Sequence, residues 1–430
     1  MNQQGYSIDT LLAHSSDFDD PSTRAYTIPI FQTNAYNFES SDYAAGLFEL
    51  KQSGHIYSRI SNPNSNLLEE SVTKLEGGAG ALAMASGHAT IFSTIINLAG
   101  AGDEIVSSIC IYGGAINLLG VTLGNLGIKT TFVDPDDMSA WENAITDKTK
   151  ALFVELIGNP NANIADLDAI SSIAKKHGIP LIVDSTFSPP CIARTIEHGA
   201  DIVIHSATKF FCGNGTTMGG IVVDSGNFVF KDNPRFPQYN EPDQSYHGMR
   251  FALDCGNKGF ISRLRALILR DVGACLSPFN AYMISMGLQT MALRVHKQCE
   301  NAMIIASYLS KHSDVEFVNF PGLEDNIYHN RAKKYLDENF FGSVFTFGLK
   351  GDRAVGARFV DNLELFSHVA NVGDLRSLVI HPATTTHSQL SAEQLKESGI
   401  NEQTIRLSIG IESPDDLISD LDKAIKKALQ

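Results

Sequence analysis

The sequence predicts an α/β protein with a mostly parallel sheet, and three observations support that fold class. Short apolar runs alternate with segments of helical periodicity between residues 81 and 223. The chain has 430 residues, more than one hydrophobic core usually contains, which favours two domains. Apolar residues make up 43% and charged residues 19% of the chain, as in ordinary compact globular proteins.

The alternation begins after a predicted helix over 66–75, which Gly77 ends. Helices are also expected after Gly87 and over 166–177. Between and after these helices lie short runs with the character of buried strands, at 81–85, 104–107, 151–156, 180–184, 201–205 and 220–223. Because such runs alternate with helices, we expect a parallel sheet covered by helices, in a large domain over residues 66–270.

The two flanking regions have a different character. Residues 1–65 carry polar and aromatic segments with turn signals, which is typical of an arm. Residues 271–430 predict a smaller α/β domain, with helices over 297–311 and 354–363 and strands over 343–349 and 404–412. The last helix is expected to begin with Ser413 as its cap and Pro414 in its first turn.

The composition argues against several classes of function. A formal net charge of -15, without a long Lys/Arg run, disfavours nucleic acid or an anionic membrane as partner. The first 20 residues lack the features of a signal peptide, and polar residues interrupt the most apolar stretch, so neither export nor a membrane span is expected. The six cysteines show no metal-ligand spacing and are expected to be reduced thiols in the cytoplasm.

A lysine placed directly after a predicted buried strand is the central functional feature. Lys209 ends the segment His205-Ser206-Ala207-Thr208-Lys209, and a glycine-rich stretch follows. In open α/β sheets, ligands bind at the carboxyl ends of the strands, so this amine would face a crevice and could condense with an aldehyde. For one lysine taken alone, a surface position is the more common interpretation.

Asp184 ends the predicted strand 180–184. A carboxylate at the tip of a buried strand needs a charged or hydrogen-bonding partner, such as a protonated pyridine nitrogen. From its position alone, a turn or cap aspartate is an equally good interpretation. Such an ion pair would keep a pyridine ring protonated, and a protonated ring stabilises a carbanion at the α-carbon of an amino acid.

A predicted helix start offers an anion site. Ser86, Gly87 and His88 open the apolar helix, so free backbone amides would face a ligand above the sheet. Ser206 and Thr208 carry hydroxyls that could reach the same phosphate. For each of these side chains, helix capping is the alternative, and Ser86 could do both.

Two further residues have the chemistry to contact an amino acid or a planar cofactor. Tyr112 precedes two glycines, and its ring could stack on a ligand; a core tyrosine is the alternative. Arg406 lies on the polar face of the strand 404–412. Its guanidinium could bind a substrate carboxylate through two parallel bonds, with a surface ion pair as the alternative.

Together these segments resemble the Cys/Met-metabolism family of pyridoxal 5′-phosphate (PLP) enzymes over nearly the whole chain. The most specific matches are Tyr57-Ser58-Arg59, Ser86-Gly87, Tyr112-Gly113-Gly114, 155–160, 184–187, Ser206 to Lys209 and the strand of Arg406. The resemblance implies an aspartate-aminotransferase-like fold of type I, with PLP bound to Lys209 as a Schiff base. The arm and the smaller C-terminal domain would flank the PLP-binding domain.

The resemblance also implies a role for each site residue. Lys209 and Tyr112 would be catalytic, and Arg406 would bind the substrate carboxylate, helped by Asn371. The cofactor would be held by Tyr57, Arg59, Ser86, Gly87, His88, Tyr112, Asn159, Asp184, Ser206, Thr208 and Lys209. Among these, Tyr57 and Arg59 would reach the cofactor of a neighbouring subunit, which implies a homotetramer with active sites shared within dimers.

Within the family, three segments are most similar to O-acetylhomoserine sulfhydrylases: Tyr246-His247-Gly248, 370–374 and 377–387. The implied reaction replaces the acetate of O-acetyl-L-homoserine by sulfide or methanethiol. Gly114 stands where methionine γ-lyases commonly carry cysteine, which weakens the lyase alternative. γ-Elimination, cystathionine synthesis, a succinyl substrate and PLP binding without turnover stay open. Ser185, Ala115 and His88 depart from the usual family residues, which could shift substrate preference.

Overall fold

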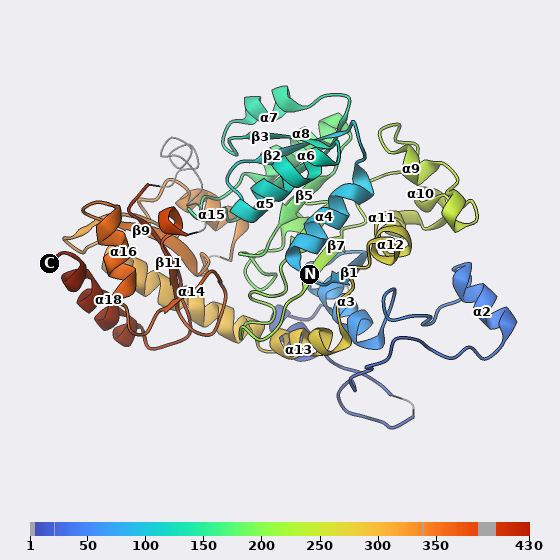
Figure 1. The fold of residues 1–430 in the computed structure, drawn as a ribbon, viewed down its shortest axis with the longest axis horizontal. Coiled ribbons are helices and arrows are strands. Elements are labelled where there is room, and N and C mark those ends of the chain that lie inside the picture. Colours follow the sequence, from blue (N-terminus) through green and yellow to red (C-terminus); the bar gives the residue numbers. More distant parts are fainter. Residues whose placement is uncertain (1–4, 21, 338, 386–400) are drawn as a thin grey trace.

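The computed structural model describes residues 5–20, 22–337, 339–385 and 401–430. Within these residues a seven-stranded sheet has the order β1-β7-β6-β5-β4-β2-β3 and forms the centre of the molecule (Figure 1). Its strands are β1 (Gly80–Met84), β2 (Glu104–Ser108), β3 (Lys129–Val133), β4 (Thr149–Glu155), β5 (Leu181–Asp184), β6 (Ile202–His205) and β7 (Gly220–Asp224). The six strands expected from apolar runs are confirmed, whereas the more polar β3 was not predicted.

The sheet is mostly parallel, and β7 is the exception. β6, β5, β4, β2 and β3 pair in parallel, while β7 pairs antiparallel with both β6 and β1. The expectation that the run 220–223 continues a parallel sheet is therefore wrong for this strand. A parallel connection requires a crossover, usually a helix, but the residues between β6 and β7 form turns and the chain reverses direction.

Both faces of this sheet are buried, because successive side chains along a strand point to opposite sides. On one face Leu152 and Val183 join a core that includes α3 (Pro63–Glu76) and α8 (Leu167–His177). On the other face Phe153 and Ile182 pack in a second core with α4 (Gly87–Leu98). Coverage on both sides explains why the strands read as continuous apolar runs.

A five-stranded sheet, with the order β10-β11-β12-β9-β8, lies at one end of the molecule (Figure 1). Its described strands are β8 (Val315–Asn319), β9 (Val344–Leu349), β10 (Ser367–His368), β11 (Leu378–Ile380) and β12 (Thr404–Ser408). The predicted helices correspond to α14 (Met291–Leu309), α16 (Arg353–Asp361) and α18 (Pro414–Ala428). Ser413 is the N-cap residue of α18 and Pro414 lies in its first turn, as expected, although the Ser413 side chain makes no capping hydrogen bond.

The remaining described elements are short. In the first 65 residues, α1 (Ile8–Ala13) packs near α3, and α2 (Ser41–Phe48) projects from the body (Figure 1). The other helices are α5 (Gly113–Asn117), α6 (Leu123–Asn125), α7 (Met138–Ala144), α9 (Pro237–Asn240), α10 (Phe251–Asp254), α11 (Gly259–Arg263), α12 (Arg270–Val272), α13 (Pro278–Leu288) and α15 (His329–Tyr335). Two π-helical segments, Leu118–Thr122 and Leu264–Leu269, continue α5 and α11. Short 3-10 turns lie at Thr195–His198, Gln244–Tyr246, Gly256–Lys258 and Pro382–Thr384.

The predicted domain boundaries near residues 65 and 270 stay predictions.

In the described part of the chain, no helix combines the length and apolar character that a membrane span requires. Each of the six cysteines is a free thiol. Two residues of the segment 377–387, Thr386 and His387, lie outside the described residues.

Gly220, the first residue of β7, allows this strand to pass directly beneath the start of α4. A Cβ at Gly220 would lie 2.2 Å from the Ser86 carbonyl oxygen and 2.7 Å from the Gly87 nitrogen. We expect Gly220→Ala to cost about 1–3 kcal/mol through overpacking, and to lower Tm by several degrees in a calorimetric scan. Gly124→Ala is the matched control, because open space surrounds that helical glycine. Equal melting temperatures for the two variants would contradict this account.

Candidate active site

A cavity of about 260 Å³ lies at the carboxyl ends of β4, β5 and β6. It brings together every predicted site residue except Tyr57 and Arg59. The predicted residues that line it are Ser86, Gly87, His88, Tyr112, Asn159, Asp184, Ser206, Thr208, Lys209, Asn371 and Arg406. Residues from both sheets therefore contribute to one cavity, as expected for ligands that bind at strand ends.

Lys209 reaches the cavity from the turn that follows β6. The last residue of β6, His205, is buried and its Nε2 lies 2.5 Å from Oε1 of Glu76, the last residue of α3. Lys209 Nζ donates a hydrogen bond to Asn371 Oδ1 at 2.6 Å. Burial and the nearby charge of Arg406 lower the pKa of Lys209 to about 8. The amine is therefore much easier to deprotonate than that of a surface lysine.

Two buried carboxyl groups end neighbouring strands. Burial raises the pKa of Asp184 above its ordinary value, and hydrogen bonds from Thr186 oppose that shift. Glu155 Oε1 accepts a hydrogen bond from the Tyr112 backbone N–H at 2.7 Å. Burial and then the charge of Asp184 raise the pKa of Glu155 well above its usual range. The charge of Asp184 thus disfavours the ionised form of Glu155.

The start of α4 has the backbone geometry that suits an anion. Ser86 Oγ accepts a hydrogen bond from the Ala89 N–H, so the predicted cap is confirmed. A Cβ at Gly87 would lie 2.8 Å from the Ser206 Cβ, so only glycine allows this close approach. The first backbone amides of any helix lack intrahelical acceptors, and the first two residues of α4, Gly87 and His88, line the cavity. Thr208 Oγ1 donates to the Gly219 carbonyl at 3.1 Å while it borders the same space.

Tyr112 exposes its ring to the cavity. Its side chain is 44% exposed, which excludes the core tyrosine that was the alternative. The His88 ring lies edge-on to the Tyr112 ring, with 5.6 Å between the centroids. A Cβ at Gly114 would lie 2.6 Å from Tyr112 Cε1 and 2.9 Å from His88 Nε2. Gly114 thus gives both rings room on this wall of the cavity.

Arg406 projects into the cavity from β12 and is not a surface residue. Its side chain is buried, with hydrogen bonds from Nη1 to Asn159 Oδ1 at 2.9 Å and from Nη2 to the Asn371 carbonyl at 3.3 Å. Burial lowers the pKa of Arg406 to about 10, so the guanidinium stays charged at neutral pH. Within the described residues no carboxylate is bonded to Arg406, and such a buried cation is suited to an anionic ligand.

Sequence reasoning missed two polar residues that line this cavity, Glu155 and Thr186. The available signal for Glu155 was the same one that marked Asp184, a carboxylate at the end of an apolar run. Thr186 carried no comparable signal, because a threonine two residues beyond a strand is common in turns.

Tyr57 and Arg59 lie in the arm, away from the residues that line the Lys209 cavity. The Arg59 guanidinium stacks over the Tyr57 ring at 5.5 Å from its centroid and donates a hydrogen bond to the Arg270 carbonyl. The Tyr57 side chain is 39% exposed. Their expected position at a neighbouring subunit's cofactor stays a prediction.

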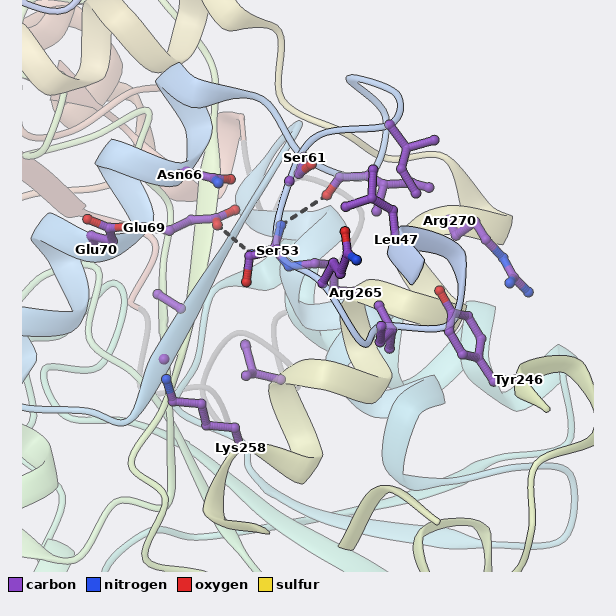
Figure 2. A pocket seen from close by; sticks show the side chains of 18 of the residues that line it. Leu47, Ser53, Ser61, Asn66, Glu69, Glu70, Tyr246, Lys258, Arg265 and Arg270 are labelled. Atoms are coloured by element: carbon purple, nitrogen blue, oxygen red, sulfur yellow. Dashed lines mark hydrogen bonds and ion pairs between the residues drawn. The ribbon is translucent and has the colours of Figure 1, made fainter. Parts of the chain in front are cut away.

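A larger cavity, of about 840 Å³, lies between the arm, α3 and residues 245–270 (Figure 2). In Figure 2 an ion pair joins Glu69 and Arg265, whose Oε2 and Nη2 atoms are 2.5 Å apart. On the far side the Arg270 guanidinium lies over the Tyr246 ring. Among the described residues that line this cavity there is none of the predicted site residues. Volume alone therefore does not identify the reactive site.

The Lys209 cavity fits PLP by the chemistry of its side chains. The amine of Lys209 matches the aldehyde, and the free amides of α4 match the phosphate. The buried carboxyl of Asp184 matches a pyridinium, because it has no bonded cation among the described residues and a cation would offset its burial. The exposed ring of Tyr112 can stack on a planar ligand.

Comparison with known proteins agrees with this fit. The chain matches the family model described as Cys/Met metabolism PLP-dependent enzyme over residues 9–426. It is 42% identical to an O-acetyl-L-homoserine sulfhydrylase of Leptospira meyeri over 97% of this chain and 96% of that protein. It is also 44% identical to a homocysteine synthase of Schizosaccharomyces pombe, over 98% of each chain.

A solved structure from Campylobacter jejuni superposes with a TM-score of 0.94 and 43% identity, over 98% of this chain and 100% of that one. It is described as an O-acetylhomoserine (thiol)-lyase and contains a pyridoxyl-lysine monophosphate. The expected type I fold is confirmed by this similarity. The extent of these matches and the composition of the cavity lead to one conclusion: the chain belongs to the Cys/Met metabolism family of PLP-dependent enzymes.

Proposed function

We propose that this chain replaces the acetate of O-acetyl-L-homoserine by sulfide, or by methanethiol, to give L-homocysteine or L-methionine. The observation that carries the proposal is the convergence of Lys209, Asp184 and Arg406 in one cavity. These groups suit an aldehyde cofactor and an amino acid carboxylate. Relatives named for homocysteine synthesis or O-acetylhomoserine sulfhydrylation, at 42% to 44% identity, support the choice of substrate.

We assign the cofactor contacts to the residues that line the cavity. Lys209 would bind PLP covalently, and Asp184 would pair with its pyridine nitrogen. Ser86, Gly87, His88, Ser206 and Thr208 would hold the phosphate, while Tyr112 would stack on the ring and Asn159 would contact its phenolic oxygen. In a tetramer, Tyr57 and Arg59 would complete the site of a neighbouring subunit. The exposure of the Tyr57 ring and its absence from the Lys209 cavity support this last assignment.

PLP, when bound, withdraws electrons from the α-carbon of an amino acid and stabilises negative charge there. Arg406 would hold the substrate carboxylate in the buried part of the cavity, and thereby fix the α-carbon near Lys209. The amine of Lys209, whose pKa is lowered to about 8, can accept the α-proton once it is neutral. Tyr112, which lines the cavity and is partly exposed, would transfer a proton near the γ-carbon through its hydroxyl.

Product analysis tests the substrate assignment. The holoenzyme is incubated with O-acetylhomoserine and, in parallel, with sulfide, methanethiol, cysteine or no thiol. We expect homocysteine with sulfide and methionine with methanethiol, with acetate released in proportion. A keto acid without thiol would indicate a lyase, and cystathionine as the main product would indicate a synthase. A parallel incubation contains O-succinylhomoserine, and release of succinate from it at an equal rate would contradict the acetyl preference. No turnover with any of these substrates would indicate a PLP-binding protein.

The lowered pKa of Lys209 predicts a pH dependence for cofactor attachment. Below about pH 8 the amine is protonated and cannot attack an aldehyde; above it the amine is neutral. We expect the rate of covalent PLP attachment to apoenzyme, measured by borohydride trapping, to rise through about pH 8 and then level off. Lys209→Ala is the control and should trap no PLP. A rate that keeps rising to about pH 10, the ordinary range for lysine, would contradict the shift.

The role of the Tyr112 hydroxyl is tested by Tyr112→Phe, which keeps an aromatic ring of nearly the same shape. We expect kcat to fall about 100-fold, as for removal of a general acid or base, with cofactor absorbance retained. The matched variant is Tyr282→Phe, on α13, whose hydroxyl is not among the groups that line the cavity. Full turnover in Tyr112→Phe with normal absorbance would remove the proton-transfer role.

A further inference from the structure

Thr186 lies between the lysine-bearing segment and Asp184, and its hydroxyl contacts both. The Ser206 backbone N–H donates to Thr186 Oγ1 at 2.8 Å. Thr186 Oγ1 in turn donates to Asp184 Oδ1 at 2.6 Å, and Thr186 also lines the Lys209 cavity. One hydroxyl therefore links the turn after β6 to the carboxyl group at the end of β5.

The available protons fix the direction of these bonds. An amide N–H can only donate, so the Thr186 oxygen accepts from Ser206 and its single proton goes to Asp184. Asp184 Oδ1 receives a second bond from the Thr186 backbone N–H at 3.0 Å. An oxygen that accepts two donors favours the ionised carboxyl group. The other oxygen, Oδ2, has no hydrogen bond within the described residues and can accept one from a group in the cavity.

The surroundings of Asp184 make this donor important. Burial raises the pKa of Asp184, and the side-chain bond from Thr186 is the largest effect in the opposite direction. The charges of His205 at the end of β6 and His88 on α4 also lower the pKa of Asp184, whereas Glu155 on β4 interacts with it as a like charge. The cations Lys209 and Arg406 line the same cavity.

We propose that Thr186 is a positioning residue that keeps Asp184 ionised and orients it, so that the pyridine nitrogen of bound PLP stays protonated. The inference rests on the pairing of Asp184 with that nitrogen in the proposed function. A purely structural role of the hydroxyl would be to hold the turn after β6 by accepting the bond from the Ser206 N–H, and loss of that bond alone would leave the protonation of the pyridine nitrogen unchanged. The two roles therefore make different predictions for variants that change only the hydroxyl.

The test compares Thr186→Val, which removes the O–H at nearly constant volume, with Thr186→Ser, which keeps it. Each holoenzyme is reconstituted with PLP labelled with nitrogen-15 in the ring, and the pyridine nitrogen shift is measured by NMR. We expect wild type and Thr186→Ser to show a protonated nitrogen, and Thr186→Val to move toward the unprotonated shift. As the pH falls, a carboxyl group with a higher pKa loses its charge at a higher pH. The acid limb of the kcat/KM profile of Thr186→Val should therefore also move to higher pH. We expect kcat to fall about ten-fold or more, the effect of one charge-assisted hydrogen bond.

Asp184→Asn separates failure of this inference from failure of the proposed function. If Asp184→Asn leaves the pyridine nitrogen as in wild type, the pairing of Asp184 with PLP is wrong. If Asp184→Asn changes the shift but Thr186→Val does not, the role of Thr186 is wrong. An equal change in Thr186→Val and Thr186→Ser would also overturn it, because the hydroxyl would then not be the cause. Thr186→Ala gives the same comparison should the valine variant fail to fold.

Discussion

The loss of water around charged groups at the carboxyl edge of the central sheet is the constraint on which the rest of the site depends. Asp184, Glu155, Lys209 and Arg406 border one cavity, and burial shifts each of their pKa values toward the neutral form. A chain could avoid this cost with apolar residues at these positions. The shifts make Lys209 a usable base near neutral pH, and leave Asp184 and Arg406 in need of oppositely charged ligands.

The sheet topology places these groups together. β4, β5 and β6 are parallel neighbours, so Glu155, Asp184 and the segment after His205 meet at one edge. Arg406 and Asn371 come from the region of the second sheet, and their bonds to Asn159 and Lys209 cross between the two parts of the chain. The part of the cavity that Arg406 and Asn371 line therefore depends on the packing of the C-terminal residues against the central sheet.

Much of this arrangement could be predicted from the sequence, because burial on both faces of a sheet leaves a strong apolar pattern. The strand that ends at Asp184 and the strand that precedes the Lys209 turn were found for that reason. β3 was missed because Lys129, Thr130 and Thr131 interrupt the apolar pattern. The direction of β7 could not be read, because an apolar run is the same in either direction. Thr186 was missed because its hydroxyl joins Asp184 to the Ser206 N–H, and only the fold brings Ser206 within reach.

The reversal of the chain after β6 has a consequence for repeated turnover. β6 and β7 are adjacent strands, so both ends of the 206–219 segment are attached to the same rigid sheet. An amine on such a short closed segment explores a small volume when it is not covalently engaged, which corresponds to a high effective concentration at its target carbon. Reattachment of Lys209 to the cofactor at the end of each cycle would therefore be governed by rotation of the lysine side chain. Such rotation is far faster than diffusion of a free amine or movement of a domain.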